Sequence, residues 1–204
     1  MITIVNYKMG NIRSIVNVLE YLGIPSRVTS SPDEILKSEK LILPGVGSYF
    51  VAMQNLQRMN LIEPLNEVAL VIKRPILGIC LGMQLFAESG TEEGEVQGLG
   101  WISGHVKRFD FKNSLHRIPH TGFNSVHFKS PKSIMYESLG NQVDFYFVHS
   151  YRMECDEEYV SGWADYHGRF VASVERNNVY GTQFHPEKSQ SNGLMVLRNF
   201  AKII

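Results

Sequence analysis

One cysteine of this sequence lies in a setting typical of a nucleophile. Cys80 is preceded by Gly78 and followed by Gly82, each two residues away. The apolar run over residues 75–79 leads into the cysteine, and a helical pattern over residues 83–88 follows it. A strand, a sharp turn and a helix in this order form a nucleophile elbow, which lifts a reactive side chain clear of an α/β sheet. A helix beginning here would favour the thiolate form of Cys80, because the positive end of its dipole lies beside the sulfur.

A histidine and a glutamate far along the chain complete the set of residues that such chemistry needs. His185 and Glu187 are two residues apart, and side chains at this spacing lie on one face of an extended segment. Glu187 can then hydrogen-bond one imidazole nitrogen while the other nitrogen faces a thiol. A lone cysteine in an apolar stretch is more often a small buried hydrophobe than a nucleophile. The two motifs together favour a catalytic triad of Cys80, His185 and Glu187.

The overall composition is that of an ordinary globular protein. The 204 residues are 44% hydrophobic and 20% charged, and we expect one domain that spans residues 1–204. The formal net charge is zero, so the sequence carries no electrostatic footprint of nucleic-acid binding. We see no signal peptide and no apolar stretch near the roughly 18 residues that a membrane span requires. We therefore expect a cytoplasmic protein whose partners include neither nucleic acid nor membrane.

Metal and cofactor sites have little support in the sequence. The two cysteines, Cys80 and Cys155, make neither a disulfide framework nor a zinc set. Cys155 lies in an acidic stretch, where we expect a raised pKa and low reactivity. The histidines lack metal-ligand spacing, and the glycines of residues 45–47 lack the lysine and the spacing of a phosphate-binding loop. We expect no metal and no cofactor.

The hydrophobic pattern predicts alternating strands and helices before residue 90 and mainly strands after it. We expect early strands at residues 2–5, 27–29, 40–43 and 75–79, with helices at 12–22, from 32, at 49–58 and at 61–73. We expect later strands at residues 101–109, 125–128, 144–148, 160–166, 170–175 and 179–184, and a last helix at 192–203. The fold class is therefore α/β: a mostly parallel, doubly wound sheet flanked by helices, with an additional antiparallel β portion.

Both motifs resemble those of the class I, triad-type glutamine amidotransferases. The carriers of the resemblance are Gly78-Ile79-Cys80-Leu81-Gly82-Met83-Gln84 and His185-Pro186-Glu187. The resemblance covers essentially the whole chain. Within the family, the sequence is similar to the glutaminase subunits of imidazole glycerol phosphate synthases, which serve histidine biosynthesis. That narrower resemblance rests on residues 9–11, 44–47, 119–124, 147–151 and 185–189.

The resemblance implies a reaction with L-glutamine. The Cys80 thiolate would attack the side-chain carboxamide to form a thioester, His185 would act as general acid and base, and Glu187 would hold the imidazole. The Leu81 N–H, directly after the nucleophile, is one candidate donor of the oxyanion hole. Family resemblance places the second donor at Val46, where a peptide flip would complete the hole. The glutamine-binding residues that it implies are Gly45, Gly47, Gln84, His149, Ser150 and Tyr151.

A partner subunit is also implied. In similar proteins the ammonia passes within a heterodimer to a (β/α)8 barrel cyclase that forms imidazole glycerol phosphate. The residues implied at that interface are Phe123, Asn124, Tyr146 and Lys188. The chain departs from the family pattern at Lys8, which replaces a glycine, and at Phe123, which replaces a tryptophan. The second departure leaves the identity of the partner open.

Several alternatives stay open at this point. The first is a paralogous glutaminase subunit that supplies ammonia for amidino-sugar formation in bacterial surface polysaccharide or glycan synthesis. Amidotransferases that feed anthranilate, nucleotide or pyridoxal phosphate synthesis share the elbow but should differ in residues 44–47 and 149–151. A non-catalytic binding module would be expected to lack a triad member, whereas this chain has all three.

Overall fold

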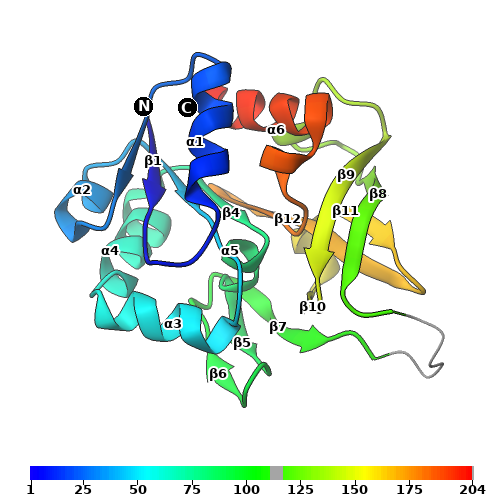
Figure 1. The fold of residues 1–204 in the computed structure, drawn as a ribbon, viewed down its shortest axis with the longest axis horizontal. Coiled ribbons are helices and arrows are strands. Elements are labelled where there is room, and N and C mark those ends of the chain that lie inside the picture. The colour runs from blue at the N-terminus through cyan, green and yellow to red at the C-terminus, as the bar shows by residue number, and fades with distance from the viewer. Residues whose placement is uncertain (111–116, 204) are drawn as a thin grey trace.

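A nine-stranded sheet forms the centre of the protein (Figure 1), whose computed structural model describes residues 1–110 and 117–203. The strand order is β2-β1-β3-β4-β13-β12-β11-β8-β9. The parallel part contains β1 (Ile2–Val5), β2 (Ser26–Thr29), β3 (Lys40–Leu43), β4 (Ile76–Ile79) and β13 (Val179–Thr182). The antiparallel part contains β12 (Arg169–Arg176), β11 (Val160–Asp165), β8 (His120–Phe128) and β9 (Gln142–His149). This arrangement confirms the predicted fold class.

Helices cover both faces of the parallel part. α1 (Ile12–Tyr21) and α6 (Gln190–Lys202) pack on one face, and α2 (Pro32–Leu36), α3 (Tyr49–Arg58) and α4 (Ile62–Asn66) pack on the other. Successive side chains of a strand point to opposite faces. In β3, Ile42 therefore joins the core with α1 and α6, whereas Leu41 and Leu43 join the core with α3 and α4. Because the parallel strands are buried on both faces, they hold the residues at their ends in fixed positions.

A second, four-stranded sheet lies below the large sheet in Figure 1, with the order β10-β7-β5-β6. Its strands are β5 (Ala87–Gly90), β6 (Val96–Gln97), β7 (Ile102–Arg108) and β10 (Tyr151–Cys155). The sequence analysis expected only β7 among them. β9 ends at His149 and β10 begins at Tyr151, so Ser150 joins the two sheets. Residues 148–151 consequently lie where the sheets meet.

Two predicted helices are wrong in part. The helix expected at residues 83–88 is α5 (Leu81–Gln84), and the chain then enters β5, because Ala87 and Ser89 pair with β7. The helix expected at residues 61–73 becomes the π-helix η1 (Glu67–Ile72) after α4. There the Asn178 side chain donates to the Ala69 carbonyl at 2.9 Å, a contact that no local pattern announces. The strands at residues 2–5 and 40–43 and the helix at 49–58 have the expected bounds.

Candidate active site

The pairing of β4 with β13 brings Cys80 close to His185. The two strands are parallel, and Ile79 lies opposite Thr182. Cys80 directly follows β4, and its N–H donates to the Thr182 carbonyl at 2.7 Å. His185 comes three residues after Thr182, and parallel strands deliver their carboxyl ends to the same edge of a sheet. One strand pair thus closes the long sequence separation between the two motifs.

The backbone at Cys80 makes the sharp turn that the sequence predicts. Its φ of 53° and ψ of −109° lie in a backbone region that residues other than glycine rarely adopt. α5 begins at the next residue, and Gly82 in α5 packs directly on the end of β3: a Cβ there would overlap the Leu43 carbonyl oxygen. α5 has only four residues, so its dipole contributes less beside Cys80 than the sequence pattern led us to expect.

His185 and Glu187 form a buried pair. His185 Nδ1 lies 2.8 Å from Glu187 Oε1, and the side chains are 1% and 2% exposed. Burial alone would lower the pKa of His185, but the negative charges of Cys80 and Glu187 outweigh it and raise the pKa to about 10. The two residues meet through the 3₁₀ turn η4 (Pro186–Lys188) and not through an extended segment, as the sequence analysis expected. His185 Nε2 has no hydrogen-bond partner within the described residues, so it is placed to exchange a proton.

The backbone of His185 is held by β9. The His185 N–H donates to the Tyr146 carbonyl at 2.9 Å. The Ser189 hydroxyl donates to the His185 carbonyl at 2.6 Å and accepts from the Tyr146 N–H at 2.9 Å. Sequence reasoning did not single out Ser189 for this bracing, because its partner Tyr146 lies far away in the chain. The base therefore cannot move without disturbing β9.

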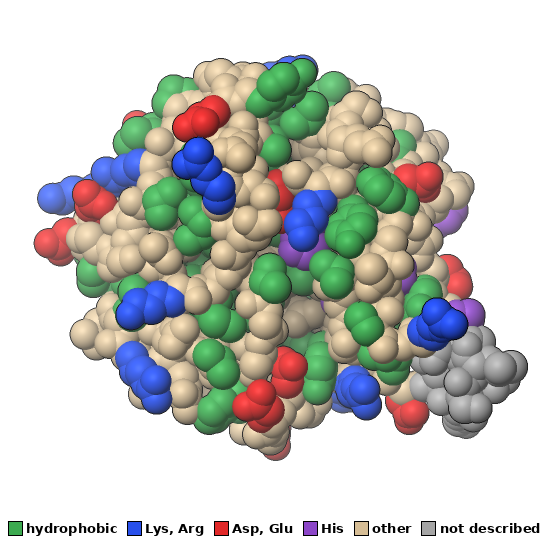
Figure 2. Space-filling model, in the orientation of Figure 1, with side chains coloured by type: hydrophobic (Ala, Val, Ile, Leu, Met, Phe, Trp, Pro, Cys, Tyr) green, Lys and Arg blue, Asp and Glu red, His purple; other side chains and the backbone are tan. Residues whose placement is uncertain are grey.

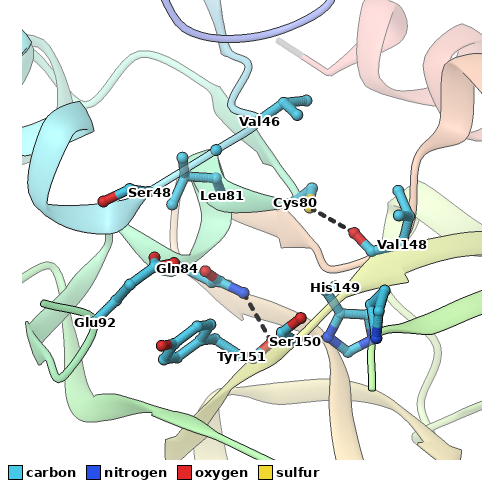
Figure 3. Close-up of a pocket in the computed structure, with 12 residues that line it drawn as sticks. Val46, Ser48, Cys80, Leu81, Gln84, Glu92, Val148, His149, Ser150 and Tyr151 are labelled. Atoms are coloured by element: carbon cyan, nitrogen blue, oxygen red, sulfur yellow. Dashed lines mark hydrogen bonds between the residues drawn. The ribbon is translucent and has the colours of Figure 1, made fainter. Parts of the chain in front are cut away.

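Cys80 opens onto a cavity of about 400 Å³ (Figure 3). Nearly all the residues expected in the oxyanion hole and the glutamine site line it, namely Val46, Gly47, Leu81, Gln84, His149, Ser150 and Tyr151. Gly45 does not line the cavity, because it is buried against α5. The cavity wall thus combines the elbow, the segment after β3 and the β9–β10 junction.

Glu92 is the charged residue among the described residues that line this cavity, and sequence reasoning missed it. It follows β5, and its Oε2 accepts a hydrogen bond from the Tyr49 N–H at 2.7 Å, which fixes it beside α3 (Figure 3). In the sequence, Glu92 is one of several glutamates in a turn-like, polar stretch. Only the packing of that turn against α3 distinguishes it. A fixed carboxylate in a cavity favours a cationic group of a ligand.

Gln84 and His149 share one backbone carbonyl, and His120 in turn bonds His149. Gln84 Nε2 donates to the Tyr151 carbonyl at 3.0 Å and to Gln183 Oε1 at 2.9 Å. His149 Nδ1 lies 2.7 Å from the same carbonyl, which can only accept, so Nδ1 carries the proton and Nε2 accepts from His120 Nδ1 at 3.0 Å. Burial lowers the pKa of His149 to about 3 and that of His120 to about 4, so both rings are neutral at pH 7. His149 therefore shapes the cavity wall with its ring nitrogens already engaged.

Three of the four residues expected at a partner interface form one cluster, whereas the Asn124 side chain contacts other residues. Phe123 on β8 lies opposite Tyr146 on β9, with ring centroids 5.7 Å apart, and is 51% exposed. Lys188 Nζ lies 5.6 Å from the centre of the Tyr146 ring. The Asn124 amide donates to the Asp165 carbonyl at 2.7 Å and to His120 Nε2 at 3.2 Å. Figure 2 shows hydrophobic side chains gathered around a basic one near the middle of the visible face. The role of Phe123, Asn124, Tyr146 and Lys188 at an interface stays a prediction.

The described residues contain neither a metal-binding cluster nor a membrane-spanning helix. Residues 1–110 and 117–203 contain no group of three or more histidine, cysteine, aspartate or glutamate side chains arranged to hold a metal ion. Among the helices in the same part of the chain, none has the length and apolar character needed to cross a bilayer.

Comparisons with known proteins all indicate one family. The family model described as glutamine amidotransferase class-I matches residues 3–204. The imidazole glycerol phosphate synthase subunit HisH 1 of Campylobacter jejuni is 46% identical over the full length of both chains, and the HisH subunit of Pelagibacter ubique is 42% identical over 99% of both. A crystal structure of a glutamine amidotransferase superimposes with a TM-score of 0.76 at 18% identity over 99% of both chains. The chain therefore belongs to the class-I glutamine amidotransferase family and is a glutamine-hydrolysing enzyme.

Proposed function

We propose that this chain is the glutaminase subunit of an imidazole glycerol phosphate synthase. Residues 1–204 act as a single domain that releases ammonia from L-glutamine and passes it to a (β/α)8 barrel cyclase, in the cytoplasm and as part of histidine biosynthesis. Relatives of that name at 42–46% identity over their full length support this pathway. The observation that carries the chemistry is the strained Cys80 on the wall of a cavity of about 400 Å³, beside the buried His185–Glu187 pair.

The triad performs the hydrolysis in two stages. The Cys80 thiolate attacks the carboxamide carbon of glutamine, a carbon–sulfur bond forms, and the negative charge moves to the oxygen. The carbon–nitrogen bond then breaks as His185 donates its proton to the departing ammonia, which leaves a thioester. His185 next takes a proton from water, whose oxygen displaces Cys80 and yields glutamate. Glu187 keeps the imidazole oriented and stabilises its charged form, and such acid–base help contributes roughly 10²–10⁴ in rate.

The oxyanion is held by two backbone N–H groups. The Leu81 N–H is in the first turn of α5, where helix N–H groups have no partner within the helix. The second donor comes from the peptide at Val46, whose side chain is 46% exposed. Gly47 has a φ of 113°, a conformation that glycine adopts without strain, so the peptide beside it can reorient at low cost. A bound partner that favours one orientation would switch the hydrolysis on.

Glu92 and Gln84 hold the amino end of the substrate. Both N–H groups of the Gln84 amide are engaged with the protein, so its Oε1 is the atom left for the ligand. An oxygen acceptor and the Glu92 carboxylate on the same wall match the ammonium group of free glutamine. Ser150, Tyr151 and Gly47 also line the cavity.

The barrel partner binds over the surface of β8, β9 and η4 that carries Phe123, Asn124, Tyr146 and Lys188. The Tyr146 carbonyl accepts the N–H of His185, so contact with the Tyr146 ring lies one hydrogen bond from the base. Ammonia released at Cys80 then passes across this interface without entering bulk water.

A reconstitution experiment tests the proposal. The chain is mixed with a histidine-pathway barrel subunit and its nucleotide substrate, and product formation with glutamine is compared with that from free ammonia. We expect glutamine hydrolysis to rise by orders of magnitude and to end in imidazole glycerol phosphate. Cys80→Ser should abolish the glutamine-dependent reaction and keep the ammonia-dependent one, whereas Cys155→Ser, the same change at the other cysteine, should leave both intact. Survival of glutamine hydrolysis in Cys80→Ser would contradict the mechanism.

A second candidate rests on Phe123, which is exposed beside Tyr146 where the family pattern has tryptophan. It is a glutaminase that supplies ammonia for amidino-sugar formation with a different barrel. No stimulation by the histidine-pathway barrel, together with labelling of Cys80 by a glutamine-like electrophile, would favour this candidate.

A further inference from the structure

Gln183 touches the sulfur of the nucleophile. It follows β13 directly, between Thr182 and the triad motif, and its side chain is fully buried. Its Nε2 donates a hydrogen bond to Cys80 Sγ at 3.5 Å. An N–H donor to a sulfur becomes stronger when the sulfur is charged, so this contact favours the thiolate over the thiol.

The orientation of the Gln183 amide is determined by its neighbours. Its Oε1 accepts from Gln84 Nε2 at 2.9 Å, and Gln84 must present that nitrogen because its other N–H donates to the Tyr151 carbonyl at 3.0 Å. A flipped Gln183 amide would place nitrogen against nitrogen at Gln84 and oxygen against the sulfur at Cys80. The chain from Tyr151 through Gln84 to Gln183 therefore aims an N–H, and not an oxygen, at the sulfur.

The other contacts of the sulfur make this donor important. The thiol of Cys80 points at the Val148 carbonyl, 3.9 Å away (Figure 3), and that contact turns repulsive once the proton leaves. α5 has only four residues and adds little from its dipole. His185 supplies a positive charge, but it must give up its proton during the reaction. Gln183 keeps its hydrogen throughout.

We propose that Gln183 is a further residue of the glutaminase reaction: its amide N–H stabilises the Cys80 thiolate and holds the sulfur in position for attack. The inference rests on Cys80 being the nucleophile of the proposed function. Gln84, which also lines the cavity, links this donor to the substrate site by one hydrogen bond. Gln183 has no direct part in binding glutamine, because it does not line the cavity.

The reactivity of the thiol against pH tests the proposal without glutamine or a partner. Cys155 is first replaced by serine, and the reaction of Cys80 with the neutral disulfide 4,4′-dithiodipyridine is followed over a range of pH. For Gln183→Met, which keeps the bulk and removes the donor, we expect the midpoint of the profile to rise by about one pH unit. A more basic thiolate attacks disulfides faster, so the limiting alkaline rate should rise about threefold while the rate well below the midpoint falls about threefold.

The pH profiles of Gln183→Met and the parent protein should therefore cross, and this crossing separates a loss of thiolate stabilisation from a general loss of structure. Gln142→Met, the same change at an exposed position at the start of β9, should leave the profile unchanged. In Gln84→Met the Gln183 amide loses the group that orients it, and we expect a shift in the same direction but smaller; this variant decides the matter if Gln183→Met does not fold. In the glutaminase assay, Gln183→Met should lower kcat about tenfold and change KM less than twofold.

Two results would overturn the inference. One is a Gln183→Met profile that coincides with that of the parent protein, and the other is a fall in rate at every pH, which would mean only that the sulfur has become less accessible. Failure of the ammonia-transfer proposal would leave the thiol profile intact, so the two ideas fail separately.

Discussion

Replacing Gly45 by alanine tests whether the segment after β3 positions the oxyanion hole. Gly45 is buried against α5, and an added Cβ would lie 2.6 Å from Gly82 N, 2.7 Å from Leu81 Cβ and 2.8 Å from the Tyr7 hydroxyl. Ordinary contact begins near 3.4 Å, so the segment must retreat by roughly 0.8 Å. Tyr7 cannot yield freely, because its hydroxyl donates to the Pro44 carbonyl at 2.6 Å.

The expected magnitudes follow from that displacement. Overpacking of a buried site costs about 1–3 kcal/mol. For a chain of this size each kcal/mol lowers Tm by about 2–4 °C, so we expect a fall of roughly 2–12 °C. The retreat also carries the Val46 peptide away from Leu81, and losing one oxyanion donor costs about 10²–10³ in kcat. KM for glutamine should change little, because the donor acts on the charge of the transition state.

Thermal unfolding and steady-state glutamine hydrolysis measure both effects on one preparation. Gly140→Ala is the matched control, since its nearest neighbours would lie 3.5 and 3.6 Å from the new Cβ. It should keep full activity and be unchanged in stability or more stable by up to about 1 kcal/mol. If Gly45→Ala kept its kcat within twofold of the parent, the segment could not be packed as described or could not supply the second donor, and the reasoning would fail.

Three further substitutions probe the charges and hydrogen bonds of the site. Glu187→Gln should lower glutamine hydrolysis roughly 10²-fold. It should also flatten the pH dependence of the free energy of unfolding, because the pKa of His185 in the folded protein is raised from 6.5 to about 10. The His185–Glu187 pair therefore stabilises the fold fully below pH 6.5 and loses that contribution as the pH rises toward 10. Urea unfolding at several pH values measures this slope. Glu92→Gln should raise KM for glutamine about tenfold with little change in kcat, because it removes binding shared by ground and transition states. His120→Phe should keep the ring stacking but leave His149 Nε2 buried without its donor, at a cost of about 1–3 kcal/mol in unfolding free energy.

Matched changes at exposed positions serve as controls. Glu93→Gln is the control for Glu92→Gln, because Glu93 is the next residue in the sequence and its side chain is exposed. His127→Phe is the control for His120→Phe, because His127 lies on the same strand, β8, and its side chain is exposed. They should leave kinetics and stability unchanged. A stability of Glu187→Gln that fell as steeply with pH as that of the parent would contradict the contribution of Glu187 to the raised pKa of His185. An unchanged KM in Glu92→Gln would remove Glu92 from the substrate site.

The parts of the site that could be predicted depend on local spacing. The elbow is recognisable because Gly78, Cys80 and Gly82 act within one turn, and the parallel strands are recognisable because burial on both faces leaves continuous apolar runs. The pairing of His185 with Glu187 also follows from two nearby residues, although through a 3₁₀ turn.

The parts that were missed depend on partners far away in the chain. Glu92 matters through α3, Gln183 through Gln84, and Ser189 through β9. Similarly, β5 forms because its residues pair with β7, and the sequence pattern over residues 83–88 by itself fits a helix equally well. No periodicity carries such information, because it arises only once the chain has folded.

The pairing of β4 with β13 has a consequence for the timing of activity. During synthesis the nucleophile strand leaves the ribosome long before the strand that brings the base, and the whole antiparallel part of the large sheet is made between them. Such distant strands meet late, because closing a long loop must precede the contacts that reward it. A nascent or partly folded chain thus holds the cysteine without His185, Glu187 and Gln183. Cys80 therefore has no catalytic partners until β13 pairs with β4, so the chain becomes active only when the large sheet is complete.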